Sequence, residues 1–230
     1  IDASAFTLGA VTIDGGAGDD TLTGSAAADS ISGGEGADTI VGSTGNDTLA
    51  GDAGNDSLDG GAGDDDMDGG AGTDYVSQTV DANQVLTDAQ LTGVGTDALA
   101  NIEAADLAGG NSANVIDASA FTGDVTLSGG AGADNLTGGT GADSIDGGAG
   151  DDSVTGGEGN DTLSGGTGSD LITGGADVAA VAQVDTVTVG DGAGTDSWAV
   201  TVDGTAVTQA FTNNMGDTIT ALIAAINADA

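Results

Sequence analysis

The chain has 230 residues, of which 38 are acidic and none is Lys, Arg or His, so its formal net charge is −38. It offers no cationic side chain to the phosphates of nucleic acid or of an anionic membrane surface, so we expect no nucleic acid as a partner, and an anionic membrane is a poor partner. Without Cys it can form no disulfide and perform no thiolate chemistry.

The chain opens on the hexapeptide IDASAF at Ile1, which returns at Ile116. The residues that follow the two hexapeptides are also alike, so a unit of about 115 residues is duplicated. No Met or signal peptide comes first, and we therefore expect a fragment or a mature segment of a longer protein. No apolar run approaches the ~20 residues of a membrane span. We interpret Phe6 and Phe121 as plugs at the ends of the two repeat blocks.

Nonapeptide repeats fill residues 15–77 and 129–173. The first block reads GGAGDDTLT, GSAAADSIS, GGEGADTIV, GSTGNDTLA, GDAGNDSLD, GGAGDDDMD and GGAGTDYVS, and the second reads GGAGADNLT, GGTGADSID, GGAGDDSVT, GGEGNDTLS and GGTGSDLIT. Position eight is always apolar, and position six is always Asp: Asp20, Asp29, Asp38, Asp47, Asp56, Asp65, Asp74, Asp134, Asp143, Asp152, Asp161 and Asp170. A disordered linker has no reason to keep two residue classes in phase, so the pattern indicates a folded repeat.

Each nonapeptide predicts one tight turn and one short strand. Glycines permit the positive φ of a turn, and the last three residues suit a strand whose central side chain points inward. Two copies then make a coil of about 18 residues, and successive coils stack about 4.8 Å apart.

Residues 78–128 form a less regular spacer with short apolar pairs between turn residues. We expect brief strands at Val85-Leu86, Leu99, Ile102, Leu107, Val115-Ile116 and Val125 to Leu127, and so further solenoid rungs. A helix over 97–107 is the alternative.

The pattern changes again at residue 177. A strand over 184–189 and a hairpin around Asp203-Gly204 are expected, followed by a helix over 217–228 with apolar residues at i, i+3, i+4 and i+7. This helix either packs in a core or belongs to a secretion signal. The expected organisation is a first block with its IDASAF rung over 1–77, the spacer over 78–128, a second block over 129–176 and a small ββα unit over 177–230.

Stacking places the aspartates of alternate copies close together, for example Asp38 above Asp20. Two carboxylates about 5 Å apart repel by roughly 3 kcal/mol at an effective dielectric near 20. One buried aliphatic side chain per copy supplies only about 1.5–3 kcal/mol. Because the chain has no cationic side chain, the column needs a metal ion, and carboxylate and carbonyl oxygens favour Ca²⁺.

The repeat GGxGxDxUx resembles the RTX nonapeptide of secreted bacterial proteins, over residues 15–77 and 129–173. The resemblance implies an all-β fold, a right-handed parallel β-roll (a β-solenoid) with calcium-binding turns, here followed by the ββα unit. It also implies that each ion lies between copies n and n+2, held by both aspartates, by carbonyls of positions two and four of the first copy, and by carbonyls of positions one and three of the second. About eight Ca²⁺ ions are expected.

Carried onto this chain, the implied ligands of the first block are Gly16, Gly18, Asp20, Asp29, Gly33, Gly34, Glu35, Gly36, Asp38, Ser43, Gly45, Asp47, Gly51, Ala53, Gly54, Asp56, Gly60, Ala62, Asp65, Gly69, Ala71 and Asp74. Those of the second block are Gly130, Gly132, Asp134, Gly139, Gly141, Asp143, Gly147, Gly148, Ala149, Gly150, Asp152, Gly156, Glu158, Asp161, Gly165, Thr167 and Asp170.

Some residues depart from the pattern. Ser25 and Ala27 replace glycines in GSAAADSIS, so we expect a weak or empty site in this copy. We interpret four further acidic residues as solvated surface: Asp19, Asp64, Asp66 and Asp151.

Two functions remain open. The first is a calcium-binding segment of a secreted structural protein, such as a surface layer, filament or adhesin, with copies of itself or other surface components as partners. The second is the calcium-binding carrier module of an RTX-type secreted enzyme or toxin. We expect no catalysis by this chain, because it has neither the His of a triad nor a Cys nucleophile. The resemblance implies an extracellular or cell-surface location reached by type I secretion.

Overall fold

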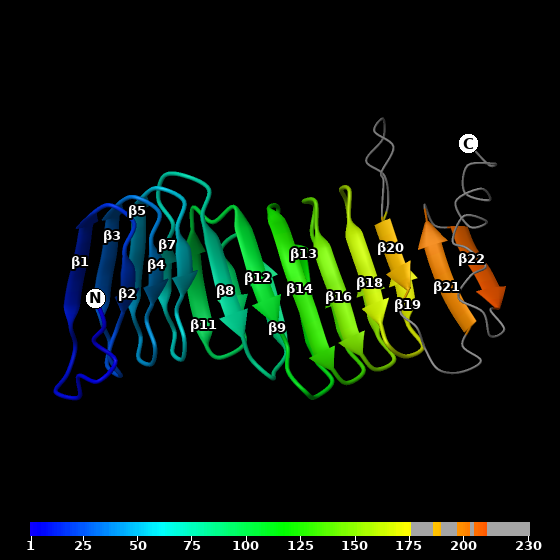
Figure 1. The fold of residues 1–230 in the computed structure, drawn as a ribbon, viewed down its shortest axis with the longest axis horizontal. Helices are drawn as coiled ribbons and strands as arrows, with labels where there is room; N and C mark the ends of the chain where they lie inside the picture. The colour runs from blue at the N-terminus through cyan, green and yellow to red at the C-terminus, as the bar shows by residue number, and fades with distance from the viewer. Residues whose placement is uncertain (176–185, 190–196, 203–204, 211–230) are drawn as a thin grey trace.

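The computed structural model is an elongated stack of short strands in two sheets (Figure 1). It describes residues 1–175 and, beyond them, the strands at 186–189, 197–202 and 205–210. In these residues every regular element is a strand, and no helix is long and apolar enough to cross a bilayer. The expectation of a parallel β-solenoid is confirmed.

Alternate strands of the chain belong to opposite sheets within the repeat blocks. The described strands of sheet A lie in the order β2 (Thr21–Thr23), β4 (Thr39–Val41), β6 (Ser57–Asp59), β8 (Tyr75–Thr79), β12 (Ala104–Ala108), β14 (Asp124–Ala131), β16 (Ser144–Ala149), β18 (Thr162–Gly166) and β20 (Thr186–Val189). Those of sheet B lie in the order β1 (Thr12–Ala17), β3 (Ser30–Glu35), β5 (Thr48–Ala53), β7 (Asp66–Asp68), β11 (Thr96–Ala100), β10 (Gln90–Thr92), β9 (Gln84–Thr87), β13 (Val115–Ala120), β15 (Asn135–Thr137), β17 (Ser153–Thr155), β19 (Leu171–Thr173), β21 (Ser197–Val202) and β22 (Thr205–Ala210).

The position-eight side chains form the core between the sheets. Leu22 pairs with Ile40, and Ile40 pairs with Leu58, so the stacking offset is two nonapeptides. Each of these side chains is 0–2% exposed: Leu22, Ile31, Ile40, Leu49, Leu58, Met67, Val76, Leu136, Ile145, Val154, Leu163 and Ile172. Because each copy contributes one core side chain, hydrophobic burial alone gives each copy only about 1.5–3 kcal/mol.

Glycines at positions two and four shape the turns. Gly34 and Gly36 have φ values of 109° and 122°, which disfavour any residue with a Cβ. A Cβ on Gly34 would overlap the carbonyl of Gly16 one rung below, and a Cβ on Gly36 would overlap that of Gly18. At Gly34 and Gly36 the stacking therefore favours glycine for both its backbone conformation and its small size, whereas Ser43 and Asp52 adopt a positive φ at position two of their copies.

The spacer continues the two sheets but is not uniformly parallel. Strands β9, β11, β12, β13 and β14 form where short strands were expected, although Ile102 lies between β11 and β12. The alternative of a helix over 97–107 is wrong. Strand β10 pairs antiparallel with both β9 and β11, so sheet B gains strands here that sheet A lacks.

The spacer also shifts the phase of the repeat in sheet A. Val76, at position eight, aligns with Ala105 and then with Val125. Thr126 pairs with Ser144, which places Val125 beside Asp143, at position six of its copy. The second block is therefore offset from the first by two residues along the strand direction, and the position-eight column of one block does not continue into that of the other.

The C-terminal strands extend the roll. Strands β21 and β22 form the expected hairpin, and β20 lies within the expected strand over 184–189. Strand β20 pairs in parallel with β18, and β21 pairs in parallel with β19, so these strands continue both sheets. The expected helix over 217–228, and with it the complete ββα unit, lies outside the described residues.

The two copies of IDASAF differ in burial. Phe121 is 1% exposed, which agrees with the interpretation as a plug, whereas Phe6 is 42% exposed, so that interpretation is wrong for Phe6. The physical reason is that strands of the spacer cover the second copy, and no described strand covers the first.

The glycine argument predicts different costs for two substitutions at the same repeat position. Gly16 has φ 97° and no atom within 4 Å of an added Cβ, because it lies in the first rung. Gly34→Ala should therefore destabilise the calcium-loaded protein by about 1–3 kcal/mol more than Gly16→Ala. Denaturant unfolding followed by circular dichroism measures the difference. Equal costs would show that the backbone conformation alone, and not the packing between rungs, demands glycine.

Candidate functional site

The position-six aspartates lie in columns along the two edges of the roll. Asp20 is half-buried, and the other eleven are only 0–4% exposed: Asp29, Asp38, Asp47, Asp56, Asp65, Asp74, Asp134, Asp143, Asp152, Asp161 and Asp170. The columns arise because each turn precedes a strand that stacks on the strand two copies away. The sequence therefore places buried acids one rung apart, as expected for Asp20 and Asp38.

One carboxylate oxygen of each aspartate joins neighbouring rungs. The Asp20 N–H donates to Asp38 Oδ1 at 2.8 Å, and the Asp38 N–H donates to Asp56 Oδ1 at 2.8 Å. The second block repeats this bond from Asp134 to Asp152 at 2.8 Å. Each Oδ1 thus satisfies a backbone donor in the rung below it.

The second oxygen has no such partner in most copies. Among the described residues, Oδ2 is buried without any hydrogen-bond partner in Asp38, Asp47, Asp56, Asp65, Asp74, Asp134 and Asp152. A buried ionised carboxylate without compensation is costly, and this chain contains no cationic side chain to supply it. These oxygens therefore point to a bound cation.

The glycine at position one opens the space into which Oδ2 points. A Cβ on Gly33 would overlap Asp38 Oδ2 and would also approach the carbonyl oxygen of Gly51, in the copy one rung away. The same pair of oxygens, a carboxylate and a position-one carbonyl, meets Gly129 as Asp134 Oδ2 and Gly147 O. A hard cation between these rungs would find both oxygen types together.

The other implied ligands line the gap between the same rungs. The carbonyl of Gly16 faces Gly34, and that of Gly18 faces Gly36. The position-three carbonyl of Glu35 accepts the Gly18 N–H at 2.6 Å, which leaves it a second lone pair. In the described residues no three acidic side chains converge, so a cage here takes most of its oxygens from the backbone. This donor set fits Ca²⁺, which accepts six to eight oxygens in flexible geometry. The individual ligands remain predictions.

The electrostatics of the columns also favour a cation. Burial raises the pKa of Asp47 to about 6, and the carboxylates of Asp65 and Asp29 in the same column add to the effect. Burial likewise raises the pKa of Asp152 to about 6, with the charges of Asp170 and Asp134 contributing. Without a cation these groups therefore resist ionisation.

The copy GSAAADSIS departs from this arrangement, as the sequence suggested. Ser25 donates to Asp29 twice, from its N–H to Oδ2 at 2.5 Å and from its Oγ to Oδ1 at 3.0 Å. Asp143 is similar, because its Oδ2 accepts the Gly139 N–H at 2.8 Å. Where the protein itself satisfies both oxygens, a cation gains less by binding.

The structure adds two acidic residues to the columns that the repeat pattern did not assign. The Asp65 N–H donates to Asp97 Oδ1 at 3.0 Å, and the Asp74 N–H donates to Glu103 Oε2 at 2.9 Å. Burial raises the pKa of Asp97 to about 6, as in the regular copies. Asp97 and Glu103 thus end the two columns of the first block.

A third addition begins a column of the second block. The Asn114 N–H donates to Asp134 Oδ1 at 2.7 Å, and Asn114 is 3% exposed. Two degenerate copies could have revealed these residues: TGVGTDALA over 92–100 has Asp97 at position six, and GGNSANVID over 109–117 has Asn114 there. Glu103 carries no comparable sequence signal.

A second ladder runs beside the aspartate columns, at position five. Asp19 Oδ1 accepts the Ala37 N–H at 2.9 Å, and Asp151 Oδ1 accepts the Ser169 N–H at 2.9 Å. Asp64, Asn46 and Asn55 make equivalent bonds. Asp19, Asp64 and Asp151 are exposed, as the sequence predicted, and each one also accepts a hydrogen bond from a backbone N–H in the next rung.

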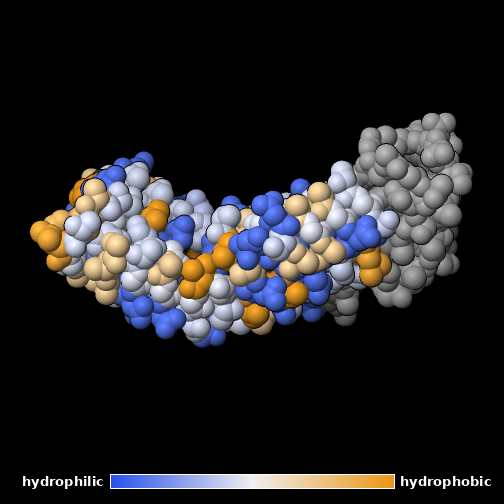
Figure 2. Space-filling model, turned by 90° about the horizontal axis from the view of Figure 1, so that it is seen from below, coloured by the Kyte–Doolittle hydropathy of each residue, from blue (hydrophilic) through white to orange (hydrophobic). Residues whose placement is uncertain are grey.

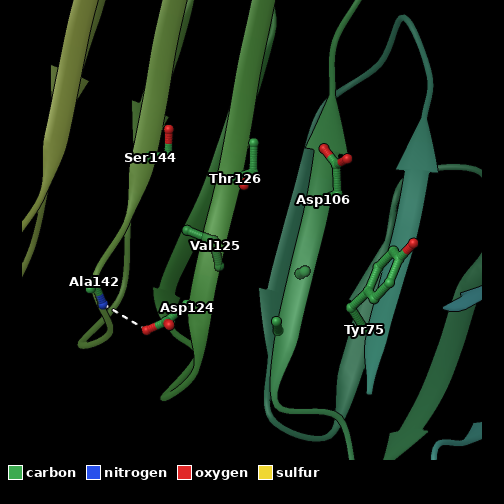
Figure 3. Close-up of a pocket in the computed structure, with 9 residues that line it drawn as sticks. Tyr75, Asp106, Asp124, Val125, Thr126, Ala142 and Ser144 are labelled. Carbon is green, nitrogen blue, oxygen red and sulfur yellow. Dashed lines mark hydrogen bonds between the residues drawn. The ribbon is translucent and has the colours of Figure 1, made fainter. Parts of the chain in front are cut away.

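A shallow depression of about 310 Å³ lies on the outer face of sheet A, where the two blocks meet (Figure 3). Tyr75, Asp106 and Asp124 line it from three neighbouring strands, and Asp124 Oδ1 accepts the Ala142 N–H at 2.7 Å. Ala104 and Ala105 of β12 also line it. No position-six residue lines the depression, although Ala142 and Ser144 flank Asp143 in the chain.

Charge removal in one column should lower calcium binding. Asp38→Asn keeps an oxygen for the Asp20 N–H but removes a charge shared by two stacked pairs, so bound calcium should fall by about one or two ions per chain. Asp66→Asn removes the same charge from an exposed position-seven residue and serves as the control. Elemental analysis after equilibrium dialysis measures both variants. Equal losses from both would refute the assignment of the columns.

The raised pKa values predict an acid-induced fold without calcium. Because burial raises the pKa values of Asp47, Asp97 and Asp152 from 3.8 to about 6, the calcium-free folded state binds more protons than the unfolded state between these values. The stability of the calcium-free fold should be greatest below pH 3.8 and lost as pH rises through about 6. Circular dichroism of decalcified protein across this range measures it. Increasing β content toward neutral pH would contradict the burial of these groups.

Comparison with known proteins agrees with the geometry. The model of the RTX calcium-binding nonapeptide repeat matches residues 12–40, 41–76, 128–163 and 155–178, together about half of the chain. A search of curated proteins found no match. The chain belongs to the family of RTX calcium-binding nonapeptide repeat proteins.

Proposed function

We propose that this chain is a structural segment of a secreted surface layer, filament or adhesin that folds when it binds extracellular calcium. The observation that carries the proposal is the row of buried, unpartnered Oδ2 atoms in a chain without Lys, Arg or His. Bound calcium balances the negative charge of the buried carboxylates. The folded solenoid then serves as the structural unit of the secreted protein.

In this proposal, folding depends on the calcium concentration and so on whether the chain lies inside or outside the cell. The calcium cage does not exist in the unfolded chain, so the free energy of binding contributes to folding. Where calcium is scarce, a net charge of −38 keeps the chain expanded. Extracellular modules bind calcium at about 0.1–1 mM, so sites of this strength fill outside the cell. RTX repeats are typical of secreted proteins, which supports this order of events.

The regular copies provide about eight stacked pairs, five in the first block and three in the second. The pair that includes Asp29 is the weakest candidate, because Ser25 already satisfies its carboxylate. The pair of Asp65 with Asp97 is an additional candidate, because both residues are buried and stacked like those of the regular copies.

A structural role fits this chain better than catalysis. It lacks His and Cys, so it can form neither a His-based triad nor a thiol nucleophile, and in this proposal calcium occupies its stacked carboxylates. The duplicated unit of about 115 residues supports an array of solenoid blocks. The full gene separates this role from that of a carrier module: further IDASAF units support the array, whereas an upstream HExxH or GxSxG motif supports a secreted enzyme.

Calcium titration tests the proposal directly. Addition of Ca²⁺ to decalcified protein at pH 7 should convert a disordered circular dichroism spectrum into a β spectrum, with about eight ions bound at saturation. A chelator should reverse the change, and Mg²⁺ at the same concentration should not reproduce it, because Mg²⁺ demands near-octahedral geometry and releases its water reluctantly. A β spectrum that is unchanged by the chelator at neutral pH would overturn the proposal.

A further inference from the structure

Asp74, in the last regular copy of the first block, keeps a buried oxygen that the regular pairing leaves without a partner. Its Oδ1 accepts the Asp56 N–H at 2.7 Å, whereas its Oδ2 has no hydrogen-bond partner, and the residue is 0% exposed. Figure 2 shows hydrophilic residues spread over one face of the molecule, where water solvates them. Asp74 has no such access, so the charge on its second oxygen needs a cation from another source.

A turn of the spacer stacks on Asp74 in the register of a regular copy. Ala104, the first residue of β12, pairs with Tyr75, the first residue of β8. Glu103 therefore precedes β12 as Asp74 precedes β8. Its Oε2 accepts the Asp74 N–H at 2.9 Å, which is the bond that a position-six aspartate makes in the regular rungs. Glu103 thus takes the place of position six, although it lies outside the nonapeptide repeats.

The backbone oxygen beside Asp74 Oδ2 comes from Asn101. A Cβ on Gly69 would overlap Asn101 O and would approach Asp74 Oδ2, so a carboxylate and a carbonyl oxygen meet here as they do at Gly33 of a regular copy. Asn101 has a φ of 52°, which Asn adopts more readily than most residues. Its Nδ2 also donates to Asp68 Oδ1 at 2.7 Å. The Asn101 carbonyl therefore stands where a regular cage has its position-one carbonyl.

The spacer turn is shorter than a regular turn. Strands β7 and β8 are joined by six residues, 69–74, whereas β11 and β12 are joined by three, 101–103. Ile102 alone stands in place of positions two to five, so this turn has no counterpart to the position-three carbonyl of a regular copy. Glu103 is exposed, unlike the position-six aspartates, of which eleven are buried. Water therefore reaches this gap from the side of the spacer.

We propose that a further Ca²⁺ ion binds between Asp74 and the turn over 101–103, outside the nonapeptide repeats. Its ligands are the carboxylates of Asp74 and Glu103 and the carbonyl of Asn101. The carbonyls of Gly70 and Gly72, at positions two and four, add to them. Oxygen ligands and two stacked carboxylates favour calcium, and the short turn leaves room for water among its six to eight ligands. This inference rests on the proposed calcium-dependent folding and adds an ion that ties the spacer to the first block.

Ion counts in two variants test the site. Glu103→Gln keeps an oxygen for the Asp74 N–H but removes a charge, so the folded chain should bind about one Ca²⁺ ion fewer. Asp74→Asn should lose about two ions, because Asp74 also belongs to the pair with Asp56. Asp106→Asn, at an exposed position of β12, is the control and should lose none. Elemental analysis after equilibrium dialysis gives the counts, and circular dichroism checks the fold. An unchanged count in folded Glu103→Gln would overturn this inference and leave the regular sites intact.

A lanthanide measurement decides the case in which Glu103→Gln does not fold. Tyr75 is the only Tyr of the chain and directly follows Asp74, and Trp198→Phe removes the only Trp. Tb³⁺ bound in place of Ca²⁺ and excited through Tyr75 should show two luminescence lifetimes, of which one is shortened by bound water and lengthens in D₂O. A single lifetime without this deuterium effect would overturn the inference. If neither Ca²⁺ nor Tb³⁺ folds the chain, the proposed function fails instead.

Discussion

The fold depends on how a column of buried carboxylates is neutralised. Each rung stacks an aspartate on the aspartate of the rung below, and the sequence provides no basic side chain anywhere. At an effective dielectric near 20, each such contact costs roughly as much as one aliphatic residue per copy returns. Hydrophobic burial alone therefore does not hold the roll together, and this is why we propose a divalent ion between the rungs.

The rest of the repeat follows from this constraint. The two carboxylate oxygens of a position-six aspartate have different surroundings. Oδ1 accepts a hydrogen bond from the backbone N–H of the preceding rung, and Oδ2 points into the space next to the position-one glycine. Position five supplies a second ladder in the opposite direction, since Asp19 accepts an N–H from the following rung. Turns that carry Asp or Asn at position five are thus bonded to both of their neighbours through side chains, and stacking is cooperative in the manner of solenoid repeats.

The spacer limits how far this cooperativity extends. Asp97 and Glu103 end the columns of the first block, and Asn114 begins one of the second. The two-residue phase shift places Val125, which has no carboxylate, beside Asp143. The sheets continue through this region, whereas the acidic columns are divided into two blocks.

The sequence by itself determined the repeat, its 18-residue coil, the core at position eight and the acidic columns at position six, because a strict period fixes what stacks on what. It also located the hairpin of β21 and β22, whose Asp-Gly turn is a local signal. Only the tertiary structure decided the antiparallel β10, the phase shift, the roles of Asp97 and Glu103, and the exposure of Phe6 beside a buried Phe121. These features depend on which strand stacks on which. Within the repeats, the 18-residue period identifies the stacking partner of each residue. Where the period breaks, the sequence no longer identifies that partner.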